Sequence, residues 1–122
     1  MKQELALEDD AAIERLVAAF EALSLPRANR THRAHLAVGV HYLRDWGLDG
    51  ALPRMRERLQ AYNLACGDPD GYSETITAAY LASIAAEISS DGRAVSMAEQ
   101  VARLQQRWPS GRTSPPQPPS PC

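Results

Sequence analysis

The chain has 122 residues and a formal net charge of −2, and its hydrophobic content of 44% is typical of a soluble globular protein. This length fits one domain with a single core. A charge near zero argues against a nucleic-acid-binding protein, whose surface is strongly basic. Apolar stretches are too short to cross a membrane, and two cysteines without signal-peptide features predict a soluble cytoplasmic protein.

Apolar residues recur at spacings of three and four, and with only 6% aromatic residues this pattern favours helices over a sheet. The first helix is predicted over about residues 10–23 and ends before Pro26, because proline disfavours helix in the residue that precedes it. The second begins with Thr31 as its N-cap and ends at Trp46, since Gly47 is typical of the left-handed conformation that commonly closes a helix.

Three further helices follow. The third is predicted over about residues 49–66 and the fourth over residues 72–90, with the glycine- and aspartate-rich turn 67–71 between them. The fifth, residues 96–108, starts with a Ser-Met-Ala-Glu capping box, in which serine and glutamate satisfy each other's backbone donors. Short connections make successive helices antiparallel neighbours. The chain is therefore predicted to be an all-α, single-domain bundle of about five helices over residues 1–108.

The last 14 residues differ in composition from the rest of the chain. Six of the nine prolines lie in residues 109–122, and such a segment neither forms a helix nor buries a core. We predict a disordered tail that is partly in the polyproline-II conformation. Residues 115–119 carry the prolines needed to dock into an aromatic groove of a protein partner.

Polar side chains gather at the starts of two predicted helices, in residues 31–35 (Thr-His-Arg-Ala-His) and 72–77 (Tyr-Ser-Glu-Thr-Ile-Thr). If the second, third and fourth helices are successively antiparallel, the second and the fourth point the same way. Both clusters then lie at one end of the bundle. The sequence therefore predicts one polar pocket for a small molecule, formed by His32, His35, Tyr72 and Glu74.

Histidine and glutamate in such a pocket indicate two kinds of chemistry. In a metal-free enzyme His32 or His35 would be the general base, because histidine titrates near neutrality, and Glu74 would orient it. In a metalloprotein the two histidines, three residues apart on one helix, would hold a divalent metal ion with Glu74 as a third ligand. The structural alternative is that both histidines contact solvent or a neighbouring loop, and that Glu74 only complements the helix dipole.

Arginine residues indicate an anion site as a further interpretation, because guanidinium groups beside a helix N-terminus bind carboxylate or phosphate. The arginines concerned are Arg27, Arg30 and Arg33 near the start of the second helix and Arg54, Arg56 and Arg58 on the third. A small anionic ligand would be bound by Arg33, Tyr72, Ser73, Thr75 and Thr77. The alternative is a solvated charged face, on which Ser73 and Thr75 act only as helix caps.

The motifs Thr-His-Arg-Ala-His-Leu at residues 31–36 and Tyr-Ser-Glu-Thr-Ile-Thr at residues 72–77 resemble those of a group of small, all-helical bacterial proteins of uncharacterised function. The resemblance covers roughly residues 10–90 and implies a histidine pair at one helix start and a Tyr-His-Glu-Thr pattern at another. The residues that match are His32, His35, Tyr72, Glu74, Thr75 and Thr77. Ser73 stands where the group usually has histidine, which argues against metal-dependent catalysis and favours a binding role.

Three functions from different classes follow from these patterns. The first is a small-molecule-binding protein or metal-free enzyme that uses the predicted pocket. The second is a metalloprotein with His32, His35 and Glu74 as ligands, and the third is a non-catalytic interaction module that uses the proline-rich tail. The first is favoured because Ser73 removes a candidate ligand from the second.

Overall fold

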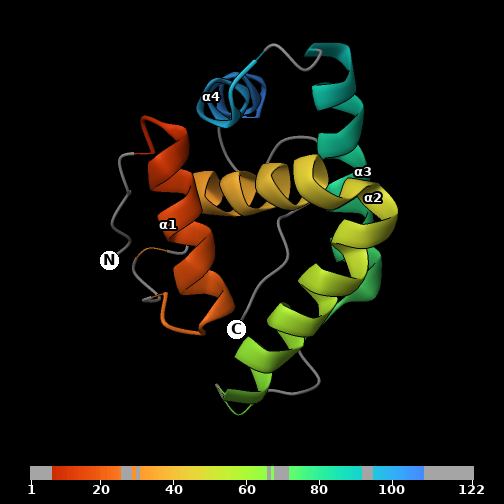
Figure 1. Cartoon of the computed structure of the whole chain (residues 1–122). Coiled ribbons are helices and arrows are strands. Elements are labelled where there is room, and N and C mark those ends of the chain that lie inside the picture. Colours follow the sequence, from red (N-terminus) through yellow and green to blue (C-terminus); the bar gives the residue numbers. More distant parts are fainter. Residues whose placement is uncertain are drawn as a thin grey trace.

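The computed structural model describes residues 7–25, 29, 31–65, 67, 72–91 and 95–108. Within these ranges the chain forms four helices and no strand: α1 (Asp10–Glu21), α2 (His32–Ala65), α3 (Glu74–Asp91) and α4 (Met97–Arg107) (Figure 1). The prediction of an all-α fold is confirmed, and none of these described helices has the length and apolar character needed to span a bilayer. The predicted tail lies outside the described residues, as do Arg27 and Arg30.

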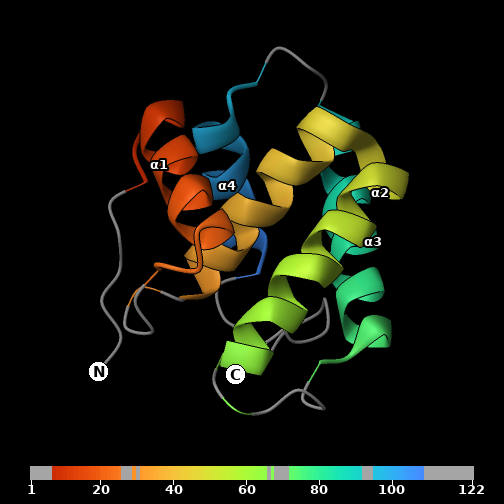
Figure 2. The same cartoon turned by 60° about the horizontal axis from the view of Figure 1, so that its bottom comes forward.

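The predicted second and third helices form one element, α2, of 34 residues, but the predicted boundary at Gly47 is confirmed, because the backbone there is not helical. Gly47 interrupts α2 with φ 70° and ψ 177°. The interruption divides the helix into a first arm, residues 32–46, and a second arm, residues 48–65, which meet at a kink (Figure 2). Gly47 has the predicted positive φ, but the chain resumes helical geometry at once and forms no connecting loop. The described part of the chain therefore has four helices where five were predicted.

Side-chain caps begin two of the helices at predicted positions. Thr31 Oγ1 accepts a hydrogen bond from the backbone nitrogen of Ala34 at 3.2 Å, at the start of α2. Ser96 Oγ accepts one from the backbone nitrogen of Glu99 at 3.1 Å, at the start of α4. Each cap satisfies a backbone donor that has no partner within its own helix, so these helix starts are determined by local sequence.

The first arm of α2 forms the centre of the fold, with α1, α3 and α4 packed around it (Figures 1 and 2). Leu36, Ala37 and Val40 of this arm have 0% exposure. Gly39 allows α3 to come close, since a Cβ atom at this position would lie only 2.8 Å from Ile84 Cδ1. Residues 36–40 are apolar and all buried, so this stretch of the arm is covered on every side, which explains its central position.

The second arm of α2 and α3 pack side by side and run in opposite directions (Figure 2). The end of α1 also lies beside this arm in both views, and Arg58 Nη1 donates a hydrogen bond to the backbone oxygen of Glu21 at 2.8 Å (Figures 1 and 2). The second arm therefore contacts both the end of α1 and α3.

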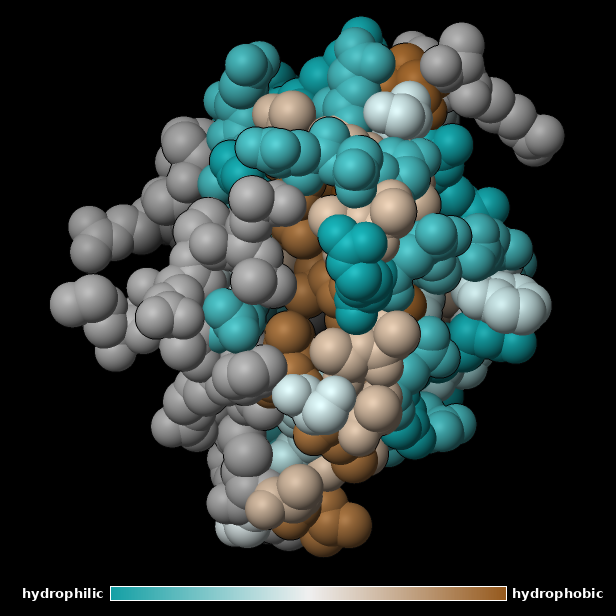
Figure 3. All heavy atoms as spheres, turned by 60° about the vertical axis from the view of Figure 1, so that its left-hand side comes forward, coloured by the Kyte–Doolittle hydropathy of each residue, from teal (hydrophilic) through white to brown (hydrophobic). Residues whose placement is uncertain are grey.

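The described surface carries several exposed large hydrophobic residues, of which three lie along α2, one follows α1 and one is on α3. Figure 3 shows the side on which α1 lies, where hydrophobic residues are visible in a narrow band between hydrophilic residues and the grey ones. Among the described residues, the large hydrophobic side chains with 37% to 68% exposure are Leu23, Trp46, Leu48, Leu64 and Ile76. Hydrophobic residues scattered in this way are common on soluble proteins and need no functional explanation.

Candidate functional site

The first predicted cluster lies at the start of α2, where both histidines bond to backbone carbonyl oxygens. His32 Nε2 is 2.7 Å from the carbonyl oxygen of Trp108, at the end of α4. His35 Nδ1 is 2.8 Å from the carbonyl oxygen of Thr31. A carbonyl oxygen only accepts hydrogen bonds, so each of these ring nitrogens carries a hydrogen and donates it. His32 therefore joins the end of α4 to the start of α2. This is a structural contact with a neighbouring segment, which was the alternative to a role in a ligand or metal site.

Arg33, the predicted ligand-binding residue of this cluster, also contacts α4. Its Nε donates a hydrogen bond to Gln105 Oε1. Arg33 lines an open cavity of about 450 Å³ together with Leu7 and Glu8 before α1 and with Ser96 and other residues at the start of α4. The contacts of the first cluster thus connect α2 with α4.

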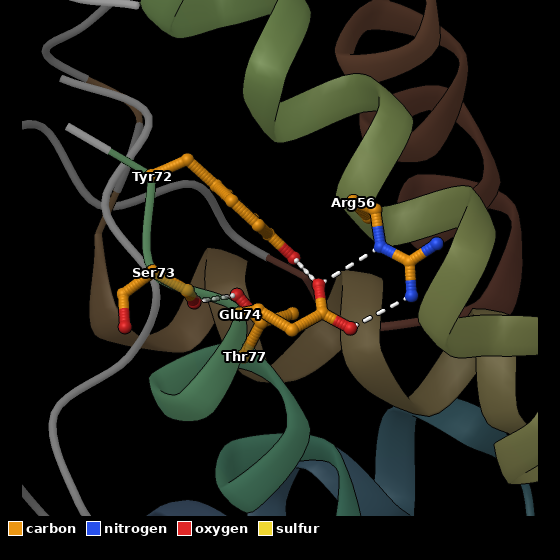
Figure 4. A network of polar contacts seen from close by, with 5 residues as sticks. All are labelled: Arg56, Tyr72, Ser73, Glu74 and Thr77. Carbon is orange, nitrogen blue, oxygen red and sulfur yellow. Dashed lines mark hydrogen bonds and ion pairs between the residues drawn. The ribbon is translucent and has the colours of Figure 1, made fainter. Parts of the chain in front are cut away.

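The second predicted cluster forms a hydrogen-bonded network at the start of α3. We call it the α3 mouth and define it by Arg56, Tyr72, Ser73, Glu74 and Thr77 (Figure 4). Arg56 Nε and Nη2 donate to the two carboxylate oxygens of Glu74 at 2.8 and 2.7 Å, and the Tyr72 hydroxyl donates to Glu74 Oε1 at 2.7 Å. Ser73 Oγ caps the first turn of α3, and the Thr77 hydroxyl donates to the Ser73 carbonyl oxygen at 2.9 Å.

The α3 mouth contains most of the predicted ligand-binding residues and one that was not assigned to it. Tyr72, Ser73, Glu74 and Thr77 lie together as predicted, and Thr75 is exposed in the first turn of α3. Arg56 joins them from the second arm of α2, 18 residues earlier in the chain than Glu74. No local sequence spacing connects Arg56 with Glu74, so only the packing of the second arm on α3 could identify this pair.

The hydrogen bonds of the α3 mouth keep Glu74 ionised. The bonds from Arg56, followed by the bond from Tyr72, lower the pKa of Glu74 from 4.5 to about 2. The bond to Glu74 raises the pKa of Arg56, and burial is the main cause of the raised pKa of Tyr72. At neutral pH Glu74 is therefore a poor proton acceptor and Tyr72 stays protonated. This carboxylate orients Arg56 and Tyr72.

The structure does not bring the three predicted metal ligands together. Within the described ranges, no group of three or more His, Cys, Asp or Glu side chains is placed to hold a metal ion. The starts of α2 and α3 lie apart in both views (Figures 1 and 2). His32 instead bonds to Trp108 at the end of α4, and Glu74 bonds to Arg56 and Tyr72.

We expect the Arg56–Glu74 pair to make stability depend on pH in the acid range. The folded-state pKa of Glu74, about 2, lies below its ordinary value of 4.5. The pair therefore stabilises the fold above the ordinary pKa, and this contribution is lost as pH falls toward the folded-state pKa. The side chains are 41% and 46% exposed, so the effect is small, as for other surface ion pairs.

Urea unfolding of Glu74→Gln followed by circular dichroism tests this expectation. The variant should have a lower free energy of unfolding than the original protein at about pH 6, and the difference should nearly vanish at about pH 2. Glu14→Gln, at an exposed position on α1, is the control and should show no such trend. An equal loss in Glu74→Gln at both pH values would show that the ion pair is not its cause.

Four side chains in the described part of the structure have buried polar atoms without a hydrogen-bond partner, and two of them, Asn63 and Tyr80, are fully buried. Both carboxamide atoms of Asn63 and the hydroxyl of Tyr80 lack a hydrogen-bond partner there, and both side chains have 0% exposure. Asn63 follows Arg56 by seven residues and so lies on the same face of the second arm, about two turns away. A single asparagine beside the buried apolar residues of this arm has no spacing that marks it as buried.

An open cavity of about 440 Å³ lies between the two arms of α2 and the end of α1. We call it the elbow cavity. It is lined by Glu21 of α1, Tyr42 of the first arm, and Pro53, Arg54, Glu57 and Arg58 of the second arm. The second arm of α2 was predicted to carry an arginine cluster, but the position of Glu21 depends on packing between α1 and α2 and has no sequence signal.

Aromatic contacts hold the walls of the elbow cavity in place. Phe20 of α1 stacks on Tyr62 of the second arm, with ring centroids 5.3 Å apart and an interplanar angle of 20°. The centroid of the Phe20 ring also lies 6.3 Å from that of the Tyr42 ring on the first arm. Phe20 therefore contacts both arms of α2, next to the hydrogen bond that Arg58 donates to Glu21.

Charged groups of both signs surround the Tyr42 hydroxyl in the elbow cavity. Burial is the main cause of its raised pKa; Glu21 raises this pKa further, and Arg58 and Arg54 act against the rise. The phenol is therefore neutral at physiological pH. It can donate and accept hydrogen bonds, but it cannot serve as a base.

Comparison with known proteins identifies no relative of this chain, so a function has to be inferred from its own geometry. Two places are candidate sites, the α3 mouth and the elbow cavity. The resemblance of residues 31–36 and 72–77 to a bacterial group stays a prediction. The chain matches no protein-family model, no curated protein and no solved structure.

Proposed function

We propose that this protein binds a small polar molecule in the elbow cavity. The observation that carries the proposal is the cavity itself: its volume of about 440 Å³ is within the range of small-molecule sites. Its lining combines guanidinium groups, carboxylates and the phenol of Tyr42. Because the walls come from α1 and from both arms of α2, a ligand there would contact all three segments.

The walls of the elbow cavity are held in position by contacts within the protein. Arg58 bonds to Glu21 and to Glu57, and the guanidinium of Arg54 lies over the Trp46 ring. Groups that are already fixed lose less conformational entropy when a ligand binds. Burial raises the pKa of Tyr42, so the phenol is protonated at physiological pH and can donate a hydrogen bond to a ligand.

The α3 mouth is a second candidate site, at a position that the sequence predicts. Its support is an exposed polar network in which Arg56, Tyr72 and Glu74 are already oriented by hydrogen bonds. The ionised Glu74 offsets the charge of Arg56, so this site suits a neutral hydrogen-bonding molecule better than the small anion that the sequence predicted.

A fragment titration of the isotope-labelled protein, followed by proton–nitrogen correlation NMR, tests both sites. The probes are small carboxylates, amines, amides, phosphates and amino acids. For the elbow cavity we expect saturable shifts of the backbone signals of Glu21, Tyr42 and Arg54. Tyr42→Phe, which removes one hydroxyl, should weaken that binding by about three- to tenfold.

The distribution of the shifts decides between the two sites. If only the backbone signals of Tyr72, Glu74 and Arg56 shift, the binding site is the α3 mouth and not the elbow cavity. If no probe shifts either group of signals, the proposal of a small-molecule-binding protein is wrong. Tyr72→Phe is the corresponding variant for the α3 mouth and should leave binding in the elbow cavity unchanged.

A further inference from the structure

The charged groups that line the elbow cavity do not all pair with one another. Arg58 donates to Glu57 Oε1 and to the backbone oxygen of Glu21, both at 2.8 Å, so the charges of Arg58 and Glu57 offset each other. Arg54 Nη1 donates to a backbone oxygen, that of Gly50, at 3.2 Å. The contacts described for this structure include none to the Glu21 carboxylate. One positive and one negative side chain therefore remain, on two different walls.

The guanidinium of Arg54 has a fixed orientation at the kink of α2. Its Cζ atom lies 3.6 Å from the centroid of the Trp46 ring, so the contact reaches from the second arm to the last residue of the first arm. A planar guanidinium that rests on an indole ring keeps its other donors available for a carboxylate. Arg54 is therefore already oriented to bind one.

We propose that the ligand of the elbow cavity is a zwitterion of the amino-acid class, with its carboxylate on Arg54 and its ammonium group on Glu21. The inference rests on the function proposed above. A simple anion would be repelled by Glu21, and a simple cation by Arg54. A molecule with both charges pairs with both remaining groups, and the Tyr42 hydroxyl can bond to the part between them.

A series of amino acids with increasing distance between the two charges tests this assignment. The probes are glycine, β-alanine, 4-aminobutanoate and 6-aminohexanoate, with acetate and ethylamine as singly charged comparisons. The signal of the Trp46 indole N–H in NMR reports binding, because Arg54 contacts this ring. We expect one chain length to bind best and both singly charged probes to bind at least about tenfold more weakly.

Charge-removing variants at exposed positions connect the binding with the two residues. Glu21→Gln and Arg54→Gln should each weaken the best zwitterion by about tenfold or more. Glu14→Gln and Arg15→Gln, at exposed positions on α1 outside the cavity lining, should leave its affinity unchanged. Thermal melting of each variant shows whether the fold is kept.

Each outcome separates the ligand class from the function on which it rests. If acetate or a neutral fragment binds in the elbow cavity as tightly as the best zwitterion, the ligand class is wrong and the small-molecule site remains. The assignment to Glu21 and Arg54 is also wrong if the zwitterion binds both of their variants with unchanged affinity. If none of the probes or fragments binds in the cavity, both proposals are wrong.

Discussion

Asn63→Leu should raise the free energy of unfolding by about 1–3 kcal/mol. The Asn63 side chain is fully buried, and neither of its polar atoms has a partner in the described part of the structure. The folded state therefore bears the cost of removing an amide from water without a compensating hydrogen bond. Leucine has a similar size, has no polar atoms and is a better helix former. Urea unfolding of the two proteins, followed by circular dichroism, measures the difference.

Asn63→Asp is the matched variant with the opposite expected sign. An ionised carboxylate at this buried position, with no partner described there, should lower the free energy of unfolding by about 3–5 kcal/mol at neutral pH. Burial raises the pKa of a carboxyl group in the folded state. The loss should therefore be absent below the pKa of the unfolded chain and grow as pH rises above it.

The two variants together test whether the amide of Asn63 is unpaired. Stabilisation by leucine with destabilisation by aspartate is the expected pattern. If leucine also destabilises the protein by 1 kcal/mol or more, on the order of one net hydrogen bond, Asn63 makes a favourable hydrogen bond in solution and the explanation is wrong. Because Asn63 is not among the residues that line the elbow cavity, Asn63→Leu should leave ligand binding there unchanged.

Helix limits could be predicted from the sequence because the signals that set them are local. The helix predicted over residues 10–23 is found at Asp10–Glu21, and the one predicted over residues 96–108 is found at Met97–Arg107. Ser96 caps α4 through a residue only three positions away. A bond of this kind depends on the adjacent sequence and hardly on the rest of the fold.

The path of the chain at Gly47 could not be predicted in the same way. Glycine marks a place where the helix can be interrupted, but a loop and a kink are equally compatible with it. Contacts of the second arm decide between them, among them the stacking of Tyr62 on Phe20 and the bond from Arg58 to Glu21. These contacts join segments 37 or more residues apart, a distance at which periodicity carries no information.

In the predicted site, too, contacts between residues close in the sequence could be predicted and contacts between distant residues could not. Ser73 and Thr77 lie together because one turn of helix joins them. His32 was predicted to share a pocket with Glu74, but its partner is Trp108, 76 residues away. The type of a side chain shows which bonds it can form, and the tertiary fold determines which of them it does form.

Gly47→Ala should lower the free energy of unfolding by about 1–3 kcal/mol, because the conformation at this position is essentially restricted to glycine. Gly47 has φ 70° and ψ 177°, and apart from its chain neighbours and the adjacent helix backbone no described atom lies within 4 Å of the position that a Cβ would occupy. The loss therefore comes from backbone strain and not from a clash. D-Alanine, introduced by protein semisynthesis, is the control, since the same angles lie in the mirror image of the extended region that suits an L-residue.

The same pair of variants tests whether the kink forms the elbow cavity. Tyr42 precedes Gly47 in the chain and Arg54 follows it, and both line the cavity. An L-residue that relieves its strain by straightening α2 therefore moves these two walls relative to each other. We expect Gly47→Ala to weaken binding of the best ω-amino acid in the NMR titration, and the D-alanine protein to bind it as the original protein does. If the L-alanine variant loses stability but keeps full affinity, the arms hold their angle without Gly47, and the contacts of Phe20, Tyr62 and Arg58 alone determine the shape of the cavity.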